Sequence, residues 1–229
     1  MIIHFTKESK NLYSILKSRS FALHYCGEYF GDKTGKVVSN AAHPMVSFSS
    51  YEHETLTTKT VTYGGYGIAL KKTWAVENGL TPVNYIEKNS PVALGLIALL
   101  RSRQRDTLPK ELRLPVIQLK CFTKHVRGYN SYFKDRDFCF EYENEWRFVP
   151  TIKQIKGNRI SVDFSKYDNN PDKYNKRLEP YPLRFRNEDI KFIYVQNEDE
   201  CEQFAFDFGI PKSQVVVSPW KTSTRNKAI

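Results

Sequence analysis

The stretch Glu141-Tyr-Glu-Asn-Glu-Trp-Arg-Phe-Val-Pro150 carries three carboxylates at alternate positions directly ahead of Trp-Arg-Phe-Val. Side chains two residues apart in an extended strand share one face. The charged face would then consist of Glu141, Glu143, Glu145 and Arg147. The opposite face would bury Tyr142, Trp146 and Phe148. Like charges this close raise one another's pKa, so the stretch predicts either a binding face or carboxylates neutralised by Arg and Lys.

The composition of the chain predicts a β-rich protein with an aromatic interior. Of its 229 residues, 40% are hydrophobic and 14% aromatic, which is enough for a sizeable core. Fifteen Phe and fourteen Tyr stand against only two Met. We predict a single domain over residues 1–220, with a polar excursion at 153–182 and a flexible tail at 221–229.

Strand and helix patterns follow one another along the chain without strict alternation. Strands are expected at residues 2–5, 45–49, 63–70, 115–122 and 190–195. Helices are expected around Leu12 to Leu16 and at residues 72–78, 90–104 and 199–208. Residues 27–43 are expected to form a loop, and the apolar run Pro91–Leu100 is expected to be a buried helix. This mixture predicts an α+β fold, with a mixed or antiparallel sheet and flanking helices.

The charge balance restricts the class of partner. The net charge of +10 favours nucleic acid, nucleotide phosphates or an acidic protein, and Lys and Arg concentrate at 101–127 and 151–186. The alternative is a basic protein without such a partner. The longest apolar run is too short to span a bilayer, and the chain opens without a basic segment followed by an apolar one. We therefore expect a cytoplasmic protein with no membrane partner.

The cysteines predict neither a metal site nor a disulfide framework. Cys26, Cys121, Cys139 and Cys201 are far apart, without a CxxC pair or a His at ligand spacing. Cys139 alternates with Phe138 and Phe140, which indicates a buried thiol.

Candidate binding residues lie on three predicted strands. His4 can hydrogen-bond a ligand or serve as a structural histidine, and Ser49 can present a hydroxyl to a ribose or phosphate or lie on a solvated face. In Tyr63-Gly-Gly-Tyr-Gly67, the glycines permit close approach of a ligand and a ring of Tyr63 or Tyr66 can stack on a flat heterocycle. The alternative for this segment is a tight turn with aromatic packing.

Glu143 and Glu145 are the strongest candidates for chemistry. A carboxylate near a sugar C1 stabilises the positive charge that develops there when a glycosidic bond breaks. The alternative is an ion pair within the sheet, between Glu145 and either Arg147 or a Lys from residues 120–127.

Six motifs follow one another over residues 2 to 150. They are His4-Phe-Thr, Asn11-Leu-Tyr-Ser-Ile-Leu16, Pro44-Met-Val-Ser-Phe-Ser49, Tyr63-Gly-Gly-Tyr-Gly-Ile-Ala-Leu70, Gly79-Leu-Thr-Pro-Val-Asn-Tyr-Ile86 and Glu143-Asn-Glu-Trp-Arg-Phe-Val-Pro150. As an ordered set they resemble the AbiGi family of abortive phage-resistance proteins, with weaker likeness through Phe192-Ile-Tyr-Val195. Such proteins are usually labelled as the antitoxin half of a two-gene abortive-infection system. The resemblance implies a role in phage defence and a cognate partner, without supplying chemistry.

The opening His-Phe-Thr with Asn-Leu-x-x-Ile-Leu is also similar, more distantly, to the start of DarT-like DNA ADP-ribosyltransferases. This likeness implies an ADP-ribosyltransferase-like fold that uses NAD as a substrate. It implies that Glu145 is the catalytic carboxylate, with Glu143 as its neighbour in an E-x-E pattern. The implied NAD-binding residues are His4, Thr6, Ser49, Tyr63 and Tyr66. An arginine equivalent to that of the DarT-like enzymes is not identifiable, and the glycines at 64 and 65 depart from their tyrosine motif.

Three functional hypotheses follow. The first is transfer of ADP-ribose from NAD to a nucleic-acid or protein acceptor in phage defence. The second is a non-enzymatic antitoxin or regulator that binds a partner toxin or a phage component through a basic surface. The third is a plain nucleic-acid-binding module, which no basic helix or known binding motif favours.

Overall fold

The computed structural model describes residues 1–61, 63–130 and 135–222. The chain forms two compact units. Unit 1 consists of Met1–Phe21, Ser47–Leu80 and Leu183–Ile229, and unit 2 consists of Ala22–Val46 and Thr81–Pro182. Of the predicted tail, Lys221 and Thr222 form a short strand, and residues 223–229 lie outside the described part of the chain.

The predicted α+β class is confirmed, because within the described residues nine strands form one mixed sheet. Its order is β16-β15-β6-β1-β4-β12-β7, and β13 and β3 also pair with β4. The long strand β4 (Val37–Ser50) contributes its first ten residues to unit 2 and Ser47–Ser50 to unit 1. Pairing is parallel between β15 and β16 and antiparallel at the other described junctions of this sheet.

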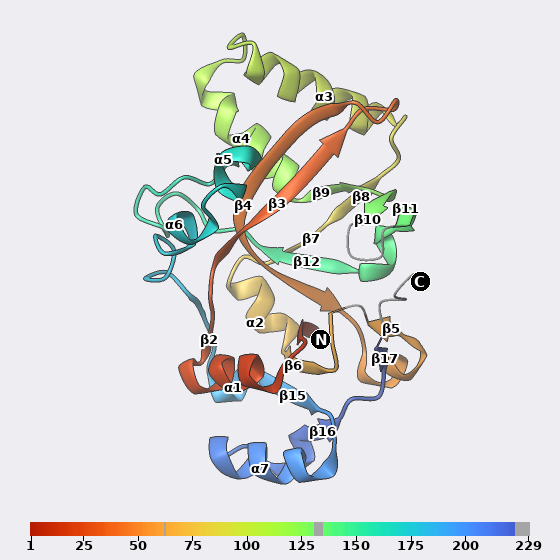
Figure 1. The fold of residues 1–229 in the computed structure, drawn as a ribbon, viewed down its shortest axis with the longest axis vertical. Helices are drawn as coiled ribbons and strands as arrows, with labels where there is room; N and C mark the ends of the chain where they lie inside the picture. The colour runs from red at the N-terminus through yellow and green to blue at the C-terminus, as the bar shows by residue number, and fades with distance from the viewer. Residues whose placement is uncertain (62, 131–134, 223–229) are drawn as a thin grey trace. The chain divides into compact units, whose positions relative to one another are not determined.

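Unit 1 is built from three segments of the chain, two of which include its ends (Figure 1). Its strands are β1 (Ile2–Thr6), β2 (Ser20–Phe21), β5 (Thr60–Val61), β6 (Tyr66–Leu70), β14 (Leu183–Arg184), β15 (Ile190–Val195), β16 (Val215–Val217) and β17 (Lys221–Thr222). Its helices are α1 (Ser9–Ser18), α2 (Lys72–Glu77) and α7 (Glu198–Phe208), with short 3-10 turns η1 (His53–Thr58), η3 (Asn187–Asp189) and η4 (Lys212–Gln214).

Two apolar clusters fill unit 1, one on each face of its strands. One contains Met1, Ile3, Leu56, Val61, Ala69, Tyr194 and Trp220. The other is aromatic and contains His4, Phe21, Phe48, Trp74 and Phe185. The alternation of β1 explains this split, since Ile3 faces the first cluster and His4 the second. The aromatic interior predicted from the composition is therefore present in this unit.

Unit 2 combines the hairpin of β3 and β4 with two packed helices. Its strands, besides β4, are β3 (His24–Gly31), β7 (Thr81–Pro82), β8 (Asn84–Ile86), β9 (Thr123–His125), β10 (Arg127–Asn130), β11 (Asp135–Cys139), β12 (Glu145–Phe148) and β13 (Val162–Asp163). Its helices are α3 (Pro91–Gln104), α4 (Lys110–Cys121), α5 (Phe164–Asp168) and α6 (Pro171–Asn175), with the 3-10 turn η2 (Phe140–Glu143). A core of Phe30, Val38, Leu96, Ile97, Leu100, Leu108 and Val116 joins the hairpin to α3 and α4.

Several predicted helices are confirmed, and residues that favour a helix end flank them. Helix α3 begins after Ser90, whose hydroxyl accepts a hydrogen bond from the backbone N–H of Ala93 at 3.2 Å, with Pro91 in its first turn. Helix α2 is followed at Gly79 by a positive φ of 75°. The acidic first turn of α7 complements the positive end of that helix.

The predictions for residues 115–122 and 27–43 are wrong. Residues 115–122 belong mainly to helix α4, in which Val116, Ile117, Lys120 and Cys121 are buried at helical spacing. A short apolar run does not distinguish a strand from one side of a helix. Residues 27–43 are not a loop, because β3 runs to Gly31 and β4 resumes at Val37. Only the intervening turn is irregular, where the side chain of Asp32 accepts hydrogen bonds from Thr34 and Lys36.

Candidate functional site

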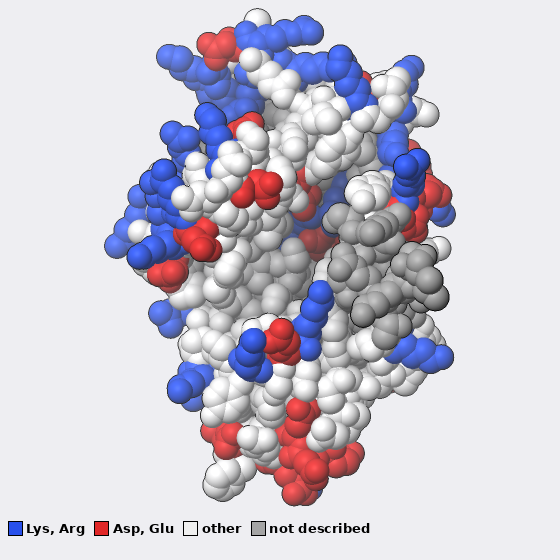
Figure 2. Space-filling view, in the orientation of Figure 1, with Lys and Arg blue, Asp and Glu red and all other residues white. Residues whose placement is uncertain are grey.

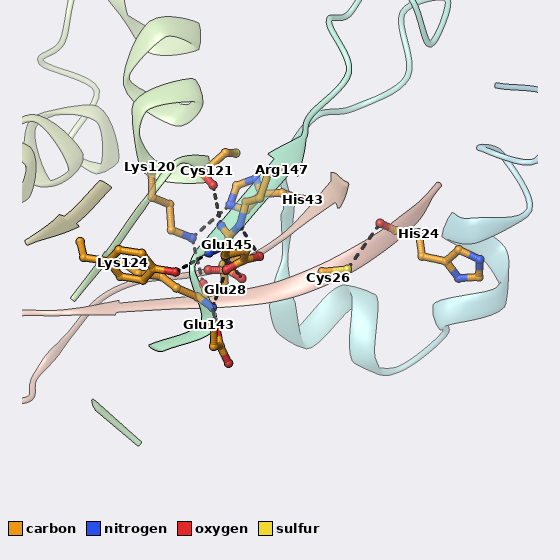
Figure 3. Close-up of polar contacts among 11 residues, drawn as sticks. His24, Cys26, Glu28, His43, Lys120, Cys121, Lys124, Glu143, Glu145 and Arg147 are labelled. Atoms are coloured by element: carbon orange, nitrogen blue, oxygen red, sulfur yellow. Dashed lines mark hydrogen bonds and ion pairs between the residues drawn. The ribbon is translucent and has the colours of Figure 1, made fainter. Parts of the chain in front are cut away.

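A cluster of charged side chains is buried inside unit 2 (Figure 3). Glu145 and Arg147 come from β12, Glu28 from β3, Lys124 from β9 and Lys120 from α4. Glu145 is 7% exposed and Arg147 only 1%. Buried charges are stable only when they are paired and hydrogen-bonded, so the contacts of each group decide what it can do.

Arg147 lies at the centre of this cluster. Its Nε donates to Oε1 of Glu145 at 2.8 Å, and its Nη2 donates to Oε2 of Glu145 at 3.0 Å. The same Nη2 donates to Oε1 of Glu28 at 2.9 Å, and Nη1 donates to the carbonyl of Cys121 at 2.5 Å. This two-pronged pairing is the geometry for which a guanidinium is suited.

Lys124 pairs with two carboxylates of the acidic stretch, those of Glu143 and Glu145. Its ammonium lies 3.0 Å from Oε2 of Glu143 and 2.8 Å from Oε2 of Glu145, and it also lies over the ring of Phe140 at 4.9 Å. Burial lowers the pKa of Lys124, but the carboxylates of Glu145, Glu28 and Glu143 outweigh burial and leave that pKa above its ordinary value.

The electrostatics of Glu145 follow from the same contacts. Burial opposes ionisation of this carboxyl, but the charges of Arg147 and Lys124 outweigh burial and hold its pKa below the usual range. Glu145 is therefore an anion with both oxygens engaged. The sequence alternative of an ion pair with Arg147 or a Lys from residues 120–127 is confirmed, since both kinds of partner are present.

The backbone around Glu145 differs from the single strand that the alternating pattern predicted. Residues 140–143 form the 3-10 turn η2, and Asn144 adopts a left-handed conformation with φ of 43°. Only Glu145–Phe148 is extended. Tyr142 is consequently 74% exposed rather than buried, while Phe148 is buried as expected. Glu143 reaches the cluster from the turn and not from the strand.

A second set of hydrogen-bonded residues, centred on Lys120 and His43, adjoins these ion pairs within unit 2. Lys120 donates to the carbonyl of Glu28 at 2.9 Å and to Nε2 of His43 at 3.1 Å, and Nδ1 of His43 donates to the carbonyl of Ile160 at 2.9 Å. Burial lowers the pKa of Lys120 to about 8. Burial, followed by the charge of Lys120, lowers the pKa of His43 to about 3.

Sequence reasoning missed Glu28 and His43, because both fall in the stretch expected to be a loop. It placed Lys120 on a strand. The aromatic residues Tyr25, Tyr29 and Phe30, of a type enriched in strands, were a signal for β3 that would have placed Glu28 on a strand.

The predicted NAD-binding residues other than Tyr63 lie on the strands of unit 1. Thr6 and Tyr66 are directly opposite each other in the β1–β6 register, and His4 lies two residues before Thr6 on the same face. Ser49 pairs with Ile3 and therefore lies on the opposite face of β1 from His4. The structure thus brings His4, Thr6 and Tyr66 to one face and separates Ser49 from them.

Other groups of the protein form hydrogen bonds with the side chains of His4, Thr6 and Tyr66. Nδ1 of His4 donates to the carbonyl of Ser47 at 2.9 Å, and partial burial lowers the pKa of this imidazole. The hydroxyl of Thr6 accepts from the side chain of Asn11 at 3.1 Å. The hydroxyl of Tyr66 donates to Oε1 of Glu200 at 2.8 Å.

The glycine segment of unit 1 packs against its own chain. A Cβ at Gly64 would meet the carbonyl oxygen of Thr6, and one at Gly65 would meet the side chain of Gln196. Gly64 also has φ of 117°, which side chains rarely adopt. Tyr63 is half exposed at the edge of this turn. The geometry therefore matches the expected alternative of a tight turn.

The thiols of Cys26 and Cys121 lack the lowered pKa of a reactive cysteine. Burial raises the pKa of Cys26 to about 11 and that of Cys121 to about 12, so both thiols stay protonated near neutral pH. Cys139 is only partly buried, and the expectation of a buried thiol there is wrong. In residues 1–61, 63–130 and 135–222, no three His, Cys, Asp or Glu side chains are grouped so that they can hold a metal ion.

Comparison with known proteins identifies one family. The family model described as "Putative abortive phage resistance protein AbiGi, antitoxin" matches residues 19–196, more than three quarters of the chain. No curated protein and no solved structure matches the chain. In the part of the chain that the structure describes, no helix is long and apolar enough to cross a membrane. The chain belongs to the AbiGi family of abortive phage-resistance proteins.

Proposed function

We propose that this protein is a non-enzymatic antitoxin, which protects the cell by binding the toxin of its abortive-infection system. Membership of a family described as antitoxin supports a cognate toxin as the partner. The observation that carries the non-enzymatic part is the engagement of Glu145. Arg147 and Lys124 occupy both oxygens of this buried carboxylate, so it is not free to face a sugar carbon.

The charges around Glu145 also disfavour a catalytic role. A catalytic carboxylate that stabilises a developing cation acts best when its charge is directed at the reacting carbon and not already neutralised. Glu145 instead shares two buried cations with Glu28 and Glu143. We therefore assign the cluster to a structural role, in which its ion pairs join β3, β9 and β12 inside unit 2.

The charge of unit 2 supports binding to an acidic protein. Unit 2 contains 21 Lys and Arg against 14 Asp and Glu, whereas unit 1 contains 14 against 11. Lys and Arg crowd the part of the surface formed by α3 to α6 (Figure 2). Opposite charges accelerate the encounter of two proteins and disfavour wrong partners.

Transfer of ADP-ribose from NAD to a nucleic-acid or protein acceptor is the second candidate. The placement of His4, Thr6 and Tyr66 on one face of unit 1 favours it, because the distant resemblance assigns all three to NAD. The proposal then requires an ADP-ribosyltransferase-like fold and a catalytic role for Glu145.

Two measurements separate these candidates. For the antitoxin, the purified chain should bind the toxin encoded by the other gene of the two-gene system and restore growth of cells that express it. It should also leave NAD intact in the presence of DNA, RNA or cell protein. Consumption of NAD that is abolished in His4→Ala or Tyr66→Phe, with folding checked by circular dichroism, would favour the transferase. Failure to bind or neutralise the toxin would refute the antitoxin.

A further inference from the structure

Helix α3 leaves an apolar face in solvent. Its first ten residues, Pro91–Leu100, contain no charged side chain, yet only Ala93, Leu96, Ile97 and Leu100 are buried. An apolar run of this kind predicts burial on all sides, and that expectation is wrong for the outer face. Val92, Leu94 and Leu99 are between 36% and 63% exposed, and Gly95 and Ala98 lie exposed among them.

The neighbouring helix α4 repeats this feature. Leu112 and Leu119 are 44% and 55% exposed, and Pro115 lies exposed between them at the helical spacing that places all three on one side. Exposed aliphatic side chains gathered on packed helices are typical of protein interfaces, whereas single ones are common on any surface.

Basic residues border these apolar faces. The connection between the helices and its flanks, residues 101–113, hold five Arg and Lys against two acidic residues. Arg101 pairs with Asp32 at 2.8 Å and Arg113 with Asp106 at 2.7 Å. Arg105 and Lys110 are exposed and have no ion-pair partner within the described residues.

From these features we propose that the outer faces of α3 and α4 are the surface on which the antitoxin binds its toxin, and that the matching toxin surface is acidic and carries aliphatic side chains. This inference rests on the proposed function and specifies where it is carried out. An apolar centre with a polar, charged border is the usual anatomy of a protein interface.

Other occupants fit less well. A second copy of this chain would bring like charges together at residues 101–113, which disfavours association. Nucleic acid needs cations or stacking rings throughout its contact surface, and the exposed part of Pro91–Leu100 offers neither.

Binding of the purified toxin, measured by calorimetry, tests the surface. Leu99→Glu and Arg105→Glu should each raise the Kd by about tenfold or more. Leu99→Glu would bury a charge in the interface, and Arg105→Glu would repel the acidic partner. Val76→Glu and Lys153→Glu are the matched controls, since Val76 is an exposed apolar residue of α2 and Lys153 an exposed lysine of unit 2. Both controls should leave the Kd unchanged.

The possible outcomes are distinct. If the toxin binds but Leu99→Glu and Arg105→Glu bind it as tightly as the unmodified chain, the surface is wrong and the antitoxin function stands. If the unmodified chain does not bind toxin, the proposed function itself fails. A dimer in sedimentation that Leu99→Glu converts to a monomer would make a second copy the occupant. If the unmodified chain binds a duplex DNA probe, and Arg105→Glu abolishes that binding while Leu99→Glu does not, the occupant of the surface is nucleic acid.

Discussion

The ammonium of Lys120 donates to Nε2 of His43 at 3.1 Å inside unit 2, so a buried cation depends on a neutral imidazole. The tautomer follows from the other ring nitrogen. A carbonyl only accepts, so Nδ1 of His43 carries the proton that is donated to Ile160. Nε2 is then unprotonated and accepts from Lys120. Protonation of His43 would set two cations against each other.

Acid should destabilise the protein through His43. The pKa of His43 is about 3 in the folded protein against 6.5 in the unfolded chain. Below pH 6.5 the unfolded chain takes up a proton that the folded protein refuses, so stability falls as pH falls. The slope from this residue is at most about 1.4 kcal/mol per pH unit. Urea unfolding between pH 5 and 7 should show this loss, and His43→Gln should remove it. An unchanged slope in that variant would contradict the assignment.

Titration of Lys120 should change the stability of the protein in the alkaline range. Its pKa is about 8 in the folded protein, against an ordinary value of 10.5. Between these values the unfolded chain holds a proton that the folded protein has released, so stability rises as pH rises. Urea unfolding from pH 7.5 to 10 should show the rise, and Lys120→Met should flatten it. A variant that keeps the full slope would show that another group titrates.

Removing one member of the central ion pair should be costly. Glu145→Gln leaves Arg147 and Lys124 with one fewer buried anion, which typically destabilises a protein by about 3–5 kcal/mol. Thermal and urea unfolding give the measurement. Arg127→Ala is the control, because its partner Asp137 is 76% exposed and such surface pairs contribute at most about 1 kcal/mol. Equal effects of the two substitutions would mean that the cluster is hydrated rather than buried.

Gly64 should not tolerate a side chain. Gly64→Ala combines a left-handed backbone with a clash against the carbonyl oxygen of Thr6, so we expect a loss of several kcal/mol, about the scale of an overpacked core. Gly35→Ala has a similar positive φ of 82° but no atom within 4 Å of the added Cβ. It should cost only about 1 kcal/mol. If both variants lost a similar amount of stability, backbone strain alone would account for the effect.

The sequence was most informative where a local signal has a local cause. The boundaries of α3 follow from Ser90 and Pro91, and the strand at Ile190–Val195 follows from its β-branched and aromatic residues. The prediction of a strand at 115–122 was wrong, because a buried strand and a buried side of a helix can both place apolar residues at neighbouring positions. The long-range contacts of Val116 decide between strand and helix.

The cluster around Arg147 was predicted only in part. Alternation along Glu145–Phe148 places Glu145 and Arg147 on one face, and the charge of Lys124 makes it an eligible partner. Glu28 is 119 residues from Arg147 in the chain. No spacing rule connects residues so far apart, because their encounter depends on β3 and β12 both pairing with β4.

The division of the chain determines which of the two units is complete first during synthesis. Unit 2 is complete once Pro182 has been synthesised, whereas unit 1 still lacks β15, β16 and α7 at that point. Translation therefore allows unit 2 to fold first, whereas unit 1 is completed only by the final segment of the chain. A premature stop near residue 182 would spare the complete set of unit 2 residues while depriving β6 of its neighbour β15. Nascent chains arrested at increasing lengths would accordingly gain protease resistance in two steps.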